Sequence, residues 1–306
     1  MLVTGASGFL GAHVVNGLAR EGATVHGTRR TPGKLPDFPV AQIAWHDIDL
    51  ARPNDAGSVI AAVRPDVVVH LAAYGARGTQ RDPQQMFDVN VLGTWSLLQA
   101  LSRSTRVVMA GTSAEYGPVS GPAHEDMLCR PASLYGGTKH AAVVLATAFA
   151  RQFCIPLVAL RHYGPFGPGD DPHRVVPTVI AGLLKGDQVA LTDGHQLRDF
   201  SYVEDHVEAI ICAATAPNLQ PGAVFNIGTG RAMTLRTALE LVAEIVAGPG
   251  RLVFDAKAAR PDDLRHLCAD VSAAARDLGF ETRISFDEGV RLTADFIRTS
   301  LASVRP

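Results

Sequence analysis

The stretch TGASGFLG at residues 4–11 decides the fold. It places Gly5, Gly8 and Gly11 three residues apart, between a short apolar run and an amphipathic one. A helix interior normally avoids glycine, which costs about 1 kcal/mol relative to alanine. After a strand, these glycines permit a tight turn, close backbone approach to a diphosphate and close helix packing. The N–H groups that start the helix can bind the phosphates. We therefore predict a dinucleotide site, the alternative being a glycine-rich turn without a ligand.

Strand and helix patterns alternate through the first half of the chain, which is typical of a doubly wound parallel α/β sheet. The predicted strands span residues 2–4, 24–28, 42–45, 67–70, 106–109 and 156–161, and the predicted helices span 9–21, 54–63, 84–103 and 136–153. Glycine and proline are dense at 163–172, where this order ends. We expect a dinucleotide-binding domain at 1–163, to which 198–229 return, and a smaller α+β substrate domain, within 164–306, built mainly from 164–197 and 230–306.

Composition excludes several classes of protein. The net charge of -2 in 306 residues gives no basic surface for nucleic acid. The four cysteines are far apart and form no zinc motif or disulfide framework, which favours a reduced, cytoplasmic setting. The apolar stretch at 140–150 is too short to span a membrane. No basic segment precedes the first strand, so a signal peptide is not expected.

The end of the second predicted strand, VHGTRR at residues 25–30, bears on the choice of cofactor. An NAD site usually places a carboxylate there, which accepts a hydrogen bond from the ribose 2′-hydroxyl. This chain has Thr28 at that place, followed by Arg29 and Arg30. Two guanidinium groups suit a 2′-phosphate, so the sequence favours NADP(H) over NAD. The alternative is a solvated basic loop.

A catalytic group is indicated by Tyr135 and Lys139, which share one helix face if a helix begins near them. A nearby ammonium is expected to lower the pKa of the phenol. Thr112 and Ser113 follow the strand predicted at 106–109, at the edge where parallel sheets bind ligands. A hydroxyl there can hold a substrate oxygen while Tyr135 transfers the proton.

With these motifs the chain resembles the extended short-chain dehydrogenase/reductase superfamily, in its nucleotide-sugar epimerase/dehydratase branch. The resemblance covers nearly the whole chain. It rests on TGASGFLG, HDIDL, VVVHLAAYG, DPQQMFDVNVLGTWSLLQA, GTSAEYG, YGGTK, LRHYGPFGPG, DGHQLRDFSYVEDHVEAI, FNIGTG and ARPDDLRHLCAD, in this order.

The resemblance implies a role for each matching residue. Thr112, Tyr135 and Lys139 would be the catalytic triad, with Lys139 also bonding the nicotinamide ribose. The cofactor would be held by Gly5, Ser7, Gly8, Phe9, Leu10, Gly11, Thr28, Arg29, Arg30, Asp47, Ile48, Leu71, Ala72, Ala73, Asn90, Tyr135 and Lys139, with Asp47 and Ile48 at the adenine. The substrate would meet Tyr74, Thr112, Ser113, His162, Arg198 and Arg260, the two arginines holding its diphosphate.

Two departures from the family pattern affect the expected reaction. Relatives generally carry Asn where this chain has Gly164, so one usual side-chain contact is missing. Dehydratases of this branch follow the catalytic Thr directly with Asp-Glu, an acid and a base for water elimination. Here Ser113 and Ala114 follow Thr112, and Glu115 is displaced by one place. The dehydratase reaction is therefore disfavoured.

Three functions remain. The first is an NADPH-dependent reductase of an NDP-4-keto-6-deoxyhexose. The second is an NDP-hexose 4-epimerase with tightly bound NAD(P), and the third is a non-catalytic dinucleotide sensor, which the presence of Tyr135 and Lys139 disfavours. The resemblance also implies a homodimer formed by the helices at 84–103 and 136–153, and no metal is expected.

Overall fold

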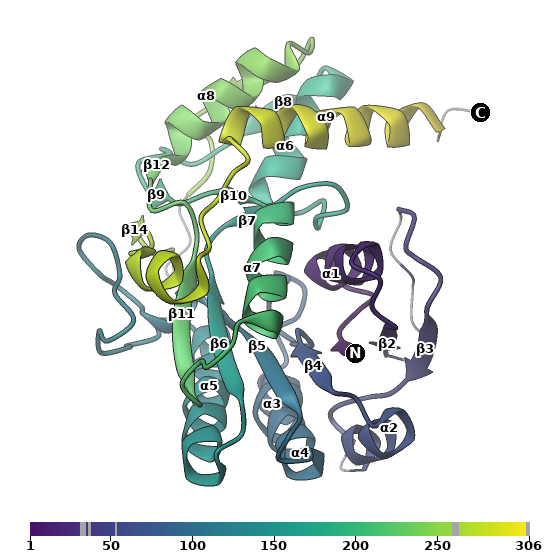
Figure 1. Ribbon diagram of the computed structural model, residues 1–306. Coiled ribbons are helices and arrows are strands. Elements are labelled where there is room, and N and C mark those ends of the chain that lie inside the picture. Colours follow the sequence, from purple (N-terminus) through teal and green to yellow (C-terminus); the bar gives the residue numbers. More distant parts are fainter. Residues whose placement is uncertain (31–34, 36–37, 53, 259–262, 304–306) are drawn as a thin grey trace.

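The computed structural model describes residues 1–30, 35, 38–52, 54–258 and 263–303. Its centre is a seven-stranded sheet in which every pair is parallel, in the order β11-β6-β5-β4-β1-β2-β3 (Figure 1). The strands are β1 (Leu2–Thr4), β2 (His26–Arg29), β3 (Ala44–Asp47), β4 (Val67–His70), β5 (Arg106–Thr112), β6 (Leu157–His162) and β11 (Ala223–Ile227). The strands that follow β1 are added on one side of it up to β3 and on the other side from β4 onward. Such folds bind ligands at the point between β1 and β4 where the strand order changes direction. The predicted doubly wound fold is confirmed.

Helices cover both faces of this sheet. On one face, α1 (Phe9–Arg20) and α7 (Val203–Thr215) share a core with the strands. On the other lie α2 (Asp55–Val63), α4 (Gly93–Ala100) and α5 (Leu134–Phe153). Successive strand residues serve opposite faces: Leu2 packs beneath α2 and Val3 beneath α1. Burial on both faces explains the continuous apolar runs in the sequence.

The helix predicted at 84–103 is broken into three pieces. These are α3 (Pro83–Phe87), one π-helical turn η1 (Asp88–Leu92), and α4, which ends at residue 100. Gly93 lies so close to Leu50 that a Cβ there would approach its side chain to 2.9 Å. The wider turn presents Asn90, which is 2% exposed, toward the catalytic helix. Such turns occur often at functional sites.

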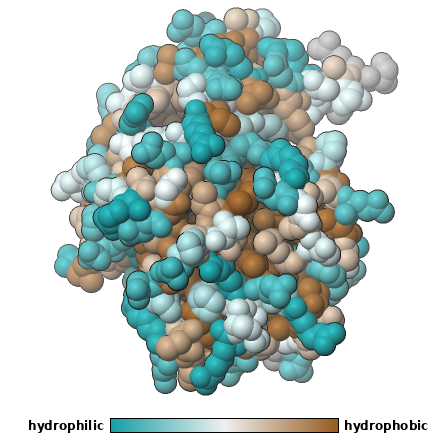
Figure 2. Space-filling model, viewed as in Figure 1, coloured by the Kyte–Doolittle hydropathy of each residue, from teal (hydrophilic) through white to brown (hydrophobic). Residues whose placement is uncertain are grey.

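The C-terminal half adds a second apolar core, above the sheet in Figure 1. It lies between α6 (Val175–Lys185), α8 (Leu235–Val246) and α9 (Phe286–Ser303), beside the strand pair β8 (Gln188–Ala190) and β13 (Arg251–Val253). Short strands near the large sheet are β7 (Pro165–Phe166), β9 (Leu197–Arg198), β10 (Ser201–Tyr202), β12 (Met233–Thr234) and β14 (His266–Leu267). The remaining turns are η2 (Ser113–Glu115) and η3 (Ala274–Leu278). Within 198–229, α7 packs on the large sheet and β11 is its edge strand beside β6. Figure 2 shows hydrophobic residues gathered toward the middle of the visible face.

Candidate active site

The glycine turn after β1 fits a dinucleotide diphosphate. Gly5 has φ +69°, and an added Cβ would lie 2.8 Å from the Ala72 backbone. A Cβ on Gly11 would lie 2.2 Å from the Gly5 carbonyl oxygen, so α1 can pack here only with glycine. The N-cap residue of α1 is Gly8, which has no side chain that could cap the helix. The first-turn N–H groups of α1, from Phe9 onward, are therefore free of a side-chain cap and can bind phosphate oxygens.

The loop after β4 lies against this turn. The Leu71 N–H donates to the Thr4 carbonyl at 3.2 Å, and the Ala72 N–H donates to the Thr4 hydroxyl at 3.3 Å. Ala73 and Tyr74 follow, both partly exposed. The structure thus brings Leu71 and Ala72, two of the residues predicted to line the cofactor, beside Gly5.

At the end of β2, the predicted cofactor residues have distinct surroundings. Thr28 is 3% exposed, and its hydroxyl accepts the Gly5 N–H at 3.2 Å, so it shapes the glycine turn. The Arg29 Nε donates to Asp47 of β3 at 2.6 Å, and its guanidinium lies 5.7 Å from the centre of the Trp45 ring. Arg30 is exposed. Asp47, predicted at the adenine, therefore also fixes the side chain of Arg29.

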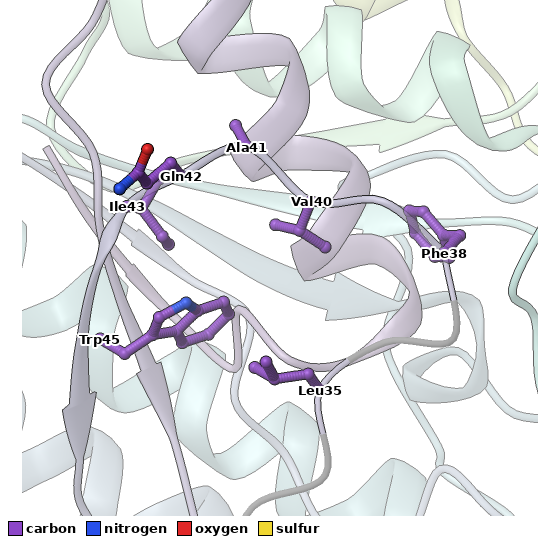
Figure 3. Close-up of a pocket in the computed structure, with 7 residues that line it drawn as sticks. All are labelled: Leu35, Phe38, Val40, Ala41, Gln42, Ile43 and Trp45. Carbon is purple, nitrogen blue, oxygen red and sulfur yellow. The ribbon is translucent and has the colours of Figure 1, made fainter.

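A cavity of about 400 Å³ lies beside this edge and contains none of the predicted catalytic residues. Its lining comes from residue 35 and the segment 38–45, including Trp45 of β3 and Ile43 (Figure 3). Its apolar lining borders the strand that carries Asp47. The predicted proton-transfer residues lie elsewhere, at β5 and α5.

The predicted triad comes together at the carboxyl end of β5. Thr112 is the last residue of that strand, and its hydroxyl lies close enough to the Tyr135 phenol to lower the pKa of that phenol. Ser133 caps α5 by accepting the Gly136 N–H at 3.1 Å, so the helix begins in time to include both Tyr135 and Lys139. Lys139 is 3% exposed, and its Nζ donates to the Ala110 carbonyl of β5 at 2.6 Å.

The proton affinity of Tyr135 differs from the sequence expectation. Burial, and to a smaller extent the Glu115 carboxylate, raise its pKa to about 12, against the opposing effects of the Thr112 hydroxyl and the charge of Arg174. Burial also lowers the pKa of Lys139 to about 8, although Glu115 opposes this. The expected lowering of the phenol pKa by the ammonium is therefore wrong for this structure, because burial and the Glu115 carboxylate raise that pKa. The phenol is a proton donor at neutral pH.

Asn90 joins the loop after β4 to the catalytic helix. Its Oδ1 accepts the Tyr74 N–H at 2.8 Å, and its Nδ2 donates to the Tyr74 carbonyl at 2.8 Å and to the Thr138 hydroxyl at 2.9 Å. Thr138 precedes Lys139 in α5. Asn90 thus uses its amide groups within the protein, and it supports the site from behind.

The predicted substrate residues lie in several environments. Ser113 is 8% exposed and His162 is 7% exposed, at the ends of neighbouring strands. The His162 Nδ1 lies 2.8 Å from the His206 Nδ1. Arg198 donates to the carbonyls of Leu197 and Leu264, at 2.8 Å and 2.7 Å, and pairs with Asp263. Arg260 lies outside the described residues.

Gly164, one of the departures from the family pattern, has a backbone reason. Its φ is +43°, and a Cβ would lie 2.2 Å from the Asp199 carbonyl oxygen. Asp199 is buried and accepts the N–H groups of Thr229, Gly230 and Ala269 at 2.9 Å, 3.0 Å and 3.1 Å. Asp199, which follows Arg198 of β9, is therefore anchored by its own hydrogen bonds and lies against Gly164, the position where relatives generally carry Asn.

Sequence reasoning missed a buried ion pair behind Thr112. The Arg161 Nε of β6 donates to the Glu115 carboxylate at 3.0 Å, and Glu115 is fully buried. His140 of α5 faces the same carboxylate oxygen, with its Nδ1 at 3.5 Å. A charged residue inside the GTSAEYG motif was the available signal, but its partner lies 46 residues away.

Neither a membrane span nor a metal site was found in the part of the chain that the structure describes. No described helix combines the length and apolarity needed to cross a bilayer. Likewise, the described His, Cys, Asp and Glu side chains form no group of three or more that could hold a metal ion.

Comparisons with known proteins agree with this geometry. The model of the NAD dependent epimerase/dehydratase family matches residues 1–228. The chain is 32% identical to a dTDP-glucose 4,6-dehydratase of Streptomyces antibioticus, over 100% of this chain and 94% of that protein. The UDP-glucose 4-epimerase of Thermotoga maritima, solved with UDP-glucose, has a TM-score of 0.89 at 29% identity, covering 98% of this chain and 99% of its own.

The UDP-glucose 4-epimerase of Thermus thermophilus was solved with NAD. It has a TM-score of 0.87 at 31% identity, covering 97% of this chain and 98% of its own. Together with the glycine turn and the Tyr135–Lys139 helix, these matches confirm the superfamily predicted from the motifs. The chain belongs to the NAD dependent epimerase/dehydratase family, as an enzyme of the extended short-chain dehydrogenase/reductase type.

Proposed function

We propose that the protein reduces the 4-keto group of an NDP-4-keto-6-deoxyhexose with NADPH. The observation that carries this proposal is the placement of Tyr135 beside Thr112 at the carboxyl end of β5, with Lys139 one turn further along α5 and the phenol protonated at neutral pH. Reduction of a ketone requires a proton donor at the carbonyl oxygen. The absence of Asp-Glu directly after Thr112 disfavours water elimination.

The chain's own residues would bind the substrate and supply the proton. The chemistry that the dinucleotide supplies when bound is the hydride that adds to the carbonyl carbon. The carbonyl π electrons then become an oxygen lone pair, and the Tyr135 hydroxyl gives its proton to that oxygen. The Thr112 hydroxyl polarises the same oxygen by hydrogen bonding. Lys139, which is cationic below its pKa of about 8, stabilises the tyrosinate left behind.

The preference for NADPH over NADH rests on the end of β2. Arg29 is oriented by Asp47 and Trp45, and Arg30 is exposed beside it. Arginine forms bidentate, charge-assisted bonds with phosphate oxygens, and no carboxylate stands in the 25–30 segment to bind a free 2′-hydroxyl. These residues support a site for the 2′-phosphate of NADPH.

Arg198 supports a diphosphate on the substrate. Its guanidinium is positioned by Asp263 and the Leu264 carbonyl. Arg260 stays a prediction, as the second cation for that diphosphate. A nucleotide diphosphate would thus lie near the 198–200 loop, with its sugar toward Thr112.

A homodimer through the helices at 84–103 and 136–153 also stays part of the proposal. Phe87 and Leu92 are each 46% exposed, and Val144 on α5 is 51% exposed. The segments that carry them pack against one another on one face of the sheet. Replacing Val144 with Glu should shift the protein to a monomer in light scattering. An unchanged molar mass would contradict this interface.

The second candidate is a 4-epimerase, favoured by the full-length similarity to UDP-glucose 4-epimerases. It would oxidise the C4 hydroxyl and return hydride to the other face, without net redox change. The test supplies NDP-4-keto-6-deoxyhexoses with NADPH and follows NADPH absorbance, and in parallel supplies NDP-hexoses alone and separates the C4 epimers. NADPH consumption supports the reductase. Epimer formation with retained dinucleotide would replace it with the epimerase.

A further inference from the structure

The buried carboxylate of Glu115 contacts the Thr112 backbone and faces α5, the helix that carries Tyr135 and Lys139. Its Oε1 accepts the Thr112 N–H at 2.8 Å, and together with the Thr112 side chain this forms a capping box for η2. Its Oε2 accepts the Arg161 Nε at 3.0 Å and faces His140 of α5. A capping glutamate normally lies in solvent, whereas this one is fully buried. Its position is therefore determined by β5, β6 and α5 together.

The packing around η2 leaves Glu115 little freedom. A Cβ on Gly111 would lie 2.6 Å from its Oε1, and a Cβ on Gly136 would lie 2.5 Å from the Ala114 carbonyl oxygen. Glycine at both places lets η2 approach β5 and the start of α5. The carboxylate consequently lies behind Thr112, next to the helix turn that carries Tyr135.

The Glu115 carboxylate and the Arg161 guanidinium form a buried ion pair whose orientation is set by further hydrogen bonds of Arg161. Arg161 is also bonded to the Tyr116 hydroxyl at 2.8 Å and to the Glu125 carbonyl at 3.4 Å, on the side away from α5. Burial alone would raise the pKa of Glu115, but His140, Arg161, the Thr112 N–H and Lys139 outweigh burial and lower it. The carboxylate is thus ionised. The charged groups facing it or the phenol are Arg161, His140, Lys139 and Arg174.

We propose that Glu115 is a positioning residue that holds Thr112 at its strand end and favours the protonated form of Tyr135, which biases the site toward protonating a ketone. This inference rests on the proposed reduction. An anion beside a phenol disfavours the phenolate and favours an adjacent ammonium. Glu115 therefore maintains Tyr135 as an acid and Lys139 as a cation. Oxidation of a hydroxyl, in contrast, begins with a phenolate base.

The experiment separates charge from position. The phenols are labelled at Cζ with ¹³C and titrated by NMR from about pH 8 to about pH 13, with NADP⁺ added. Only five tyrosines are present, and Tyr135→Phe assigns the relevant signal. Glu115→Gln should lower the Tyr135 midpoint by about half a pH unit or more, and should move the alkaline limb of kcat/KM the same way. Glu115→Asp should keep the midpoint while kcat falls.

Two further variants serve as controls. Glu125→Gln alters a half-buried carboxylate, which accepts the Asn226 N–H at 2.7 Å, and should leave the Tyr135 titration unchanged. If Glu115→Gln does not fold, the double variant with Arg161→Met leaves no unpaired charge and should show the same downward shift. The inference is overturned if the Tyr135 midpoint is unchanged in Glu115→Gln and in the double variant, or if Glu125→Gln shifts it by the same amount. The NMR midpoint needs no turnover, so a wild-type protein without reductase activity would count against the proposed reaction alone.

Discussion

Two arginine–carboxylate pairs, each joining neighbouring segments at the carboxyl edge of the sheet, behave differently. Arg29 and Asp47 are 27% and 45% exposed at 2.6 Å, whereas Arg161 and Glu115 are 5% and 0% exposed at 3.0 Å. The shorter contact is the weaker one, because water screens it. The longer contact lies where an unpaired charge is costly. Exposure, more than distance, decides what each pair contributes.

The same difference in exposure suits the two pairs to different tasks in the proposed reaction, recognition of the dinucleotide and control of proton transfer. The pair at β2 and β3 leaves the Arg29 guanidinium half in water, where it can exchange partners with a ligand. The pair formed by Glu115 of η2 and Arg161 of β6 is buried, so water screens its field at Tyr135 and Lys139 only weakly. A fixed charge is suited to setting proton affinities, and an accessible one to recognising phosphate.

The largest expected effect tests whether Tyr135, next to the buried Arg161–Glu115 pair, transfers the proton. Tyr135→Phe removes the proposed proton donor, and activity should fall by about 10²–10⁴-fold. Dinucleotide affinity, measured by calorimetry, should change little, because the glycine turn is untouched. Retained activity would assign proton transfer to another group.

The second prediction compares the two pairs directly by unfolding in denaturant. Arg161→Met leaves the Glu115 charge buried without its partner, and should lower the free energy of unfolding by about 3–5 kcal/mol. Arg29→Met should lower it by less than about 1 kcal/mol, since its partner is hydrated. Equal losses would show that burial does not distinguish the pairs.

The third prediction concerns pH. The pKa of Lys139 is lowered from 10.5 to about 8, so above pH 8 the unfolded chain binds more protons there than the folded one. Stability therefore rises with pH, by about 1 kcal/mol per unit between about pH 8 and 10, relative to Lys139→Met. Activity should fall over the same range, because the cation is lost. If stability and activity fell together, Lys139 would not be the titrating group.

The smallest effect concerns the exposed pair. Arg29→Met should weaken NADPH binding by about tenfold and leave NADH binding nearly unchanged, since one charge-assisted bond to phosphate is lost. Arg20→Met, which removes a surface pairing with Glu204 at 2.8 Å, is the matched control and should alter neither. Equal weakening of both dinucleotides would indicate that Arg29 acts on a part that they share.

Local patterns predicted the fold and much of the site. The glycine spacing placed the β1 turn, and the Ser133-capped helix places Tyr135 and Lys139 on one face. The Glu115–Arg161 contact could not be predicted, because it depends on strand register across 46 residues and on burial. The same burial reversed the expected pKa change of Tyr135. The π turn at Asp88–Leu92 also escaped prediction, since its apolar spacing reads as plain helix.

The hydrogen bonds of Asn90 have a mechanical consequence. Because one amide joins the Tyr74 backbone to the Thr138 hydroxyl, the loop after β4 and the helix that carries Tyr135 are tied by a single side chain. A ligand that displaces either segment must strain or break that tie. A movement of the loop after β4 would therefore be passed to α5 through three hydrogen bonds of one buried side chain.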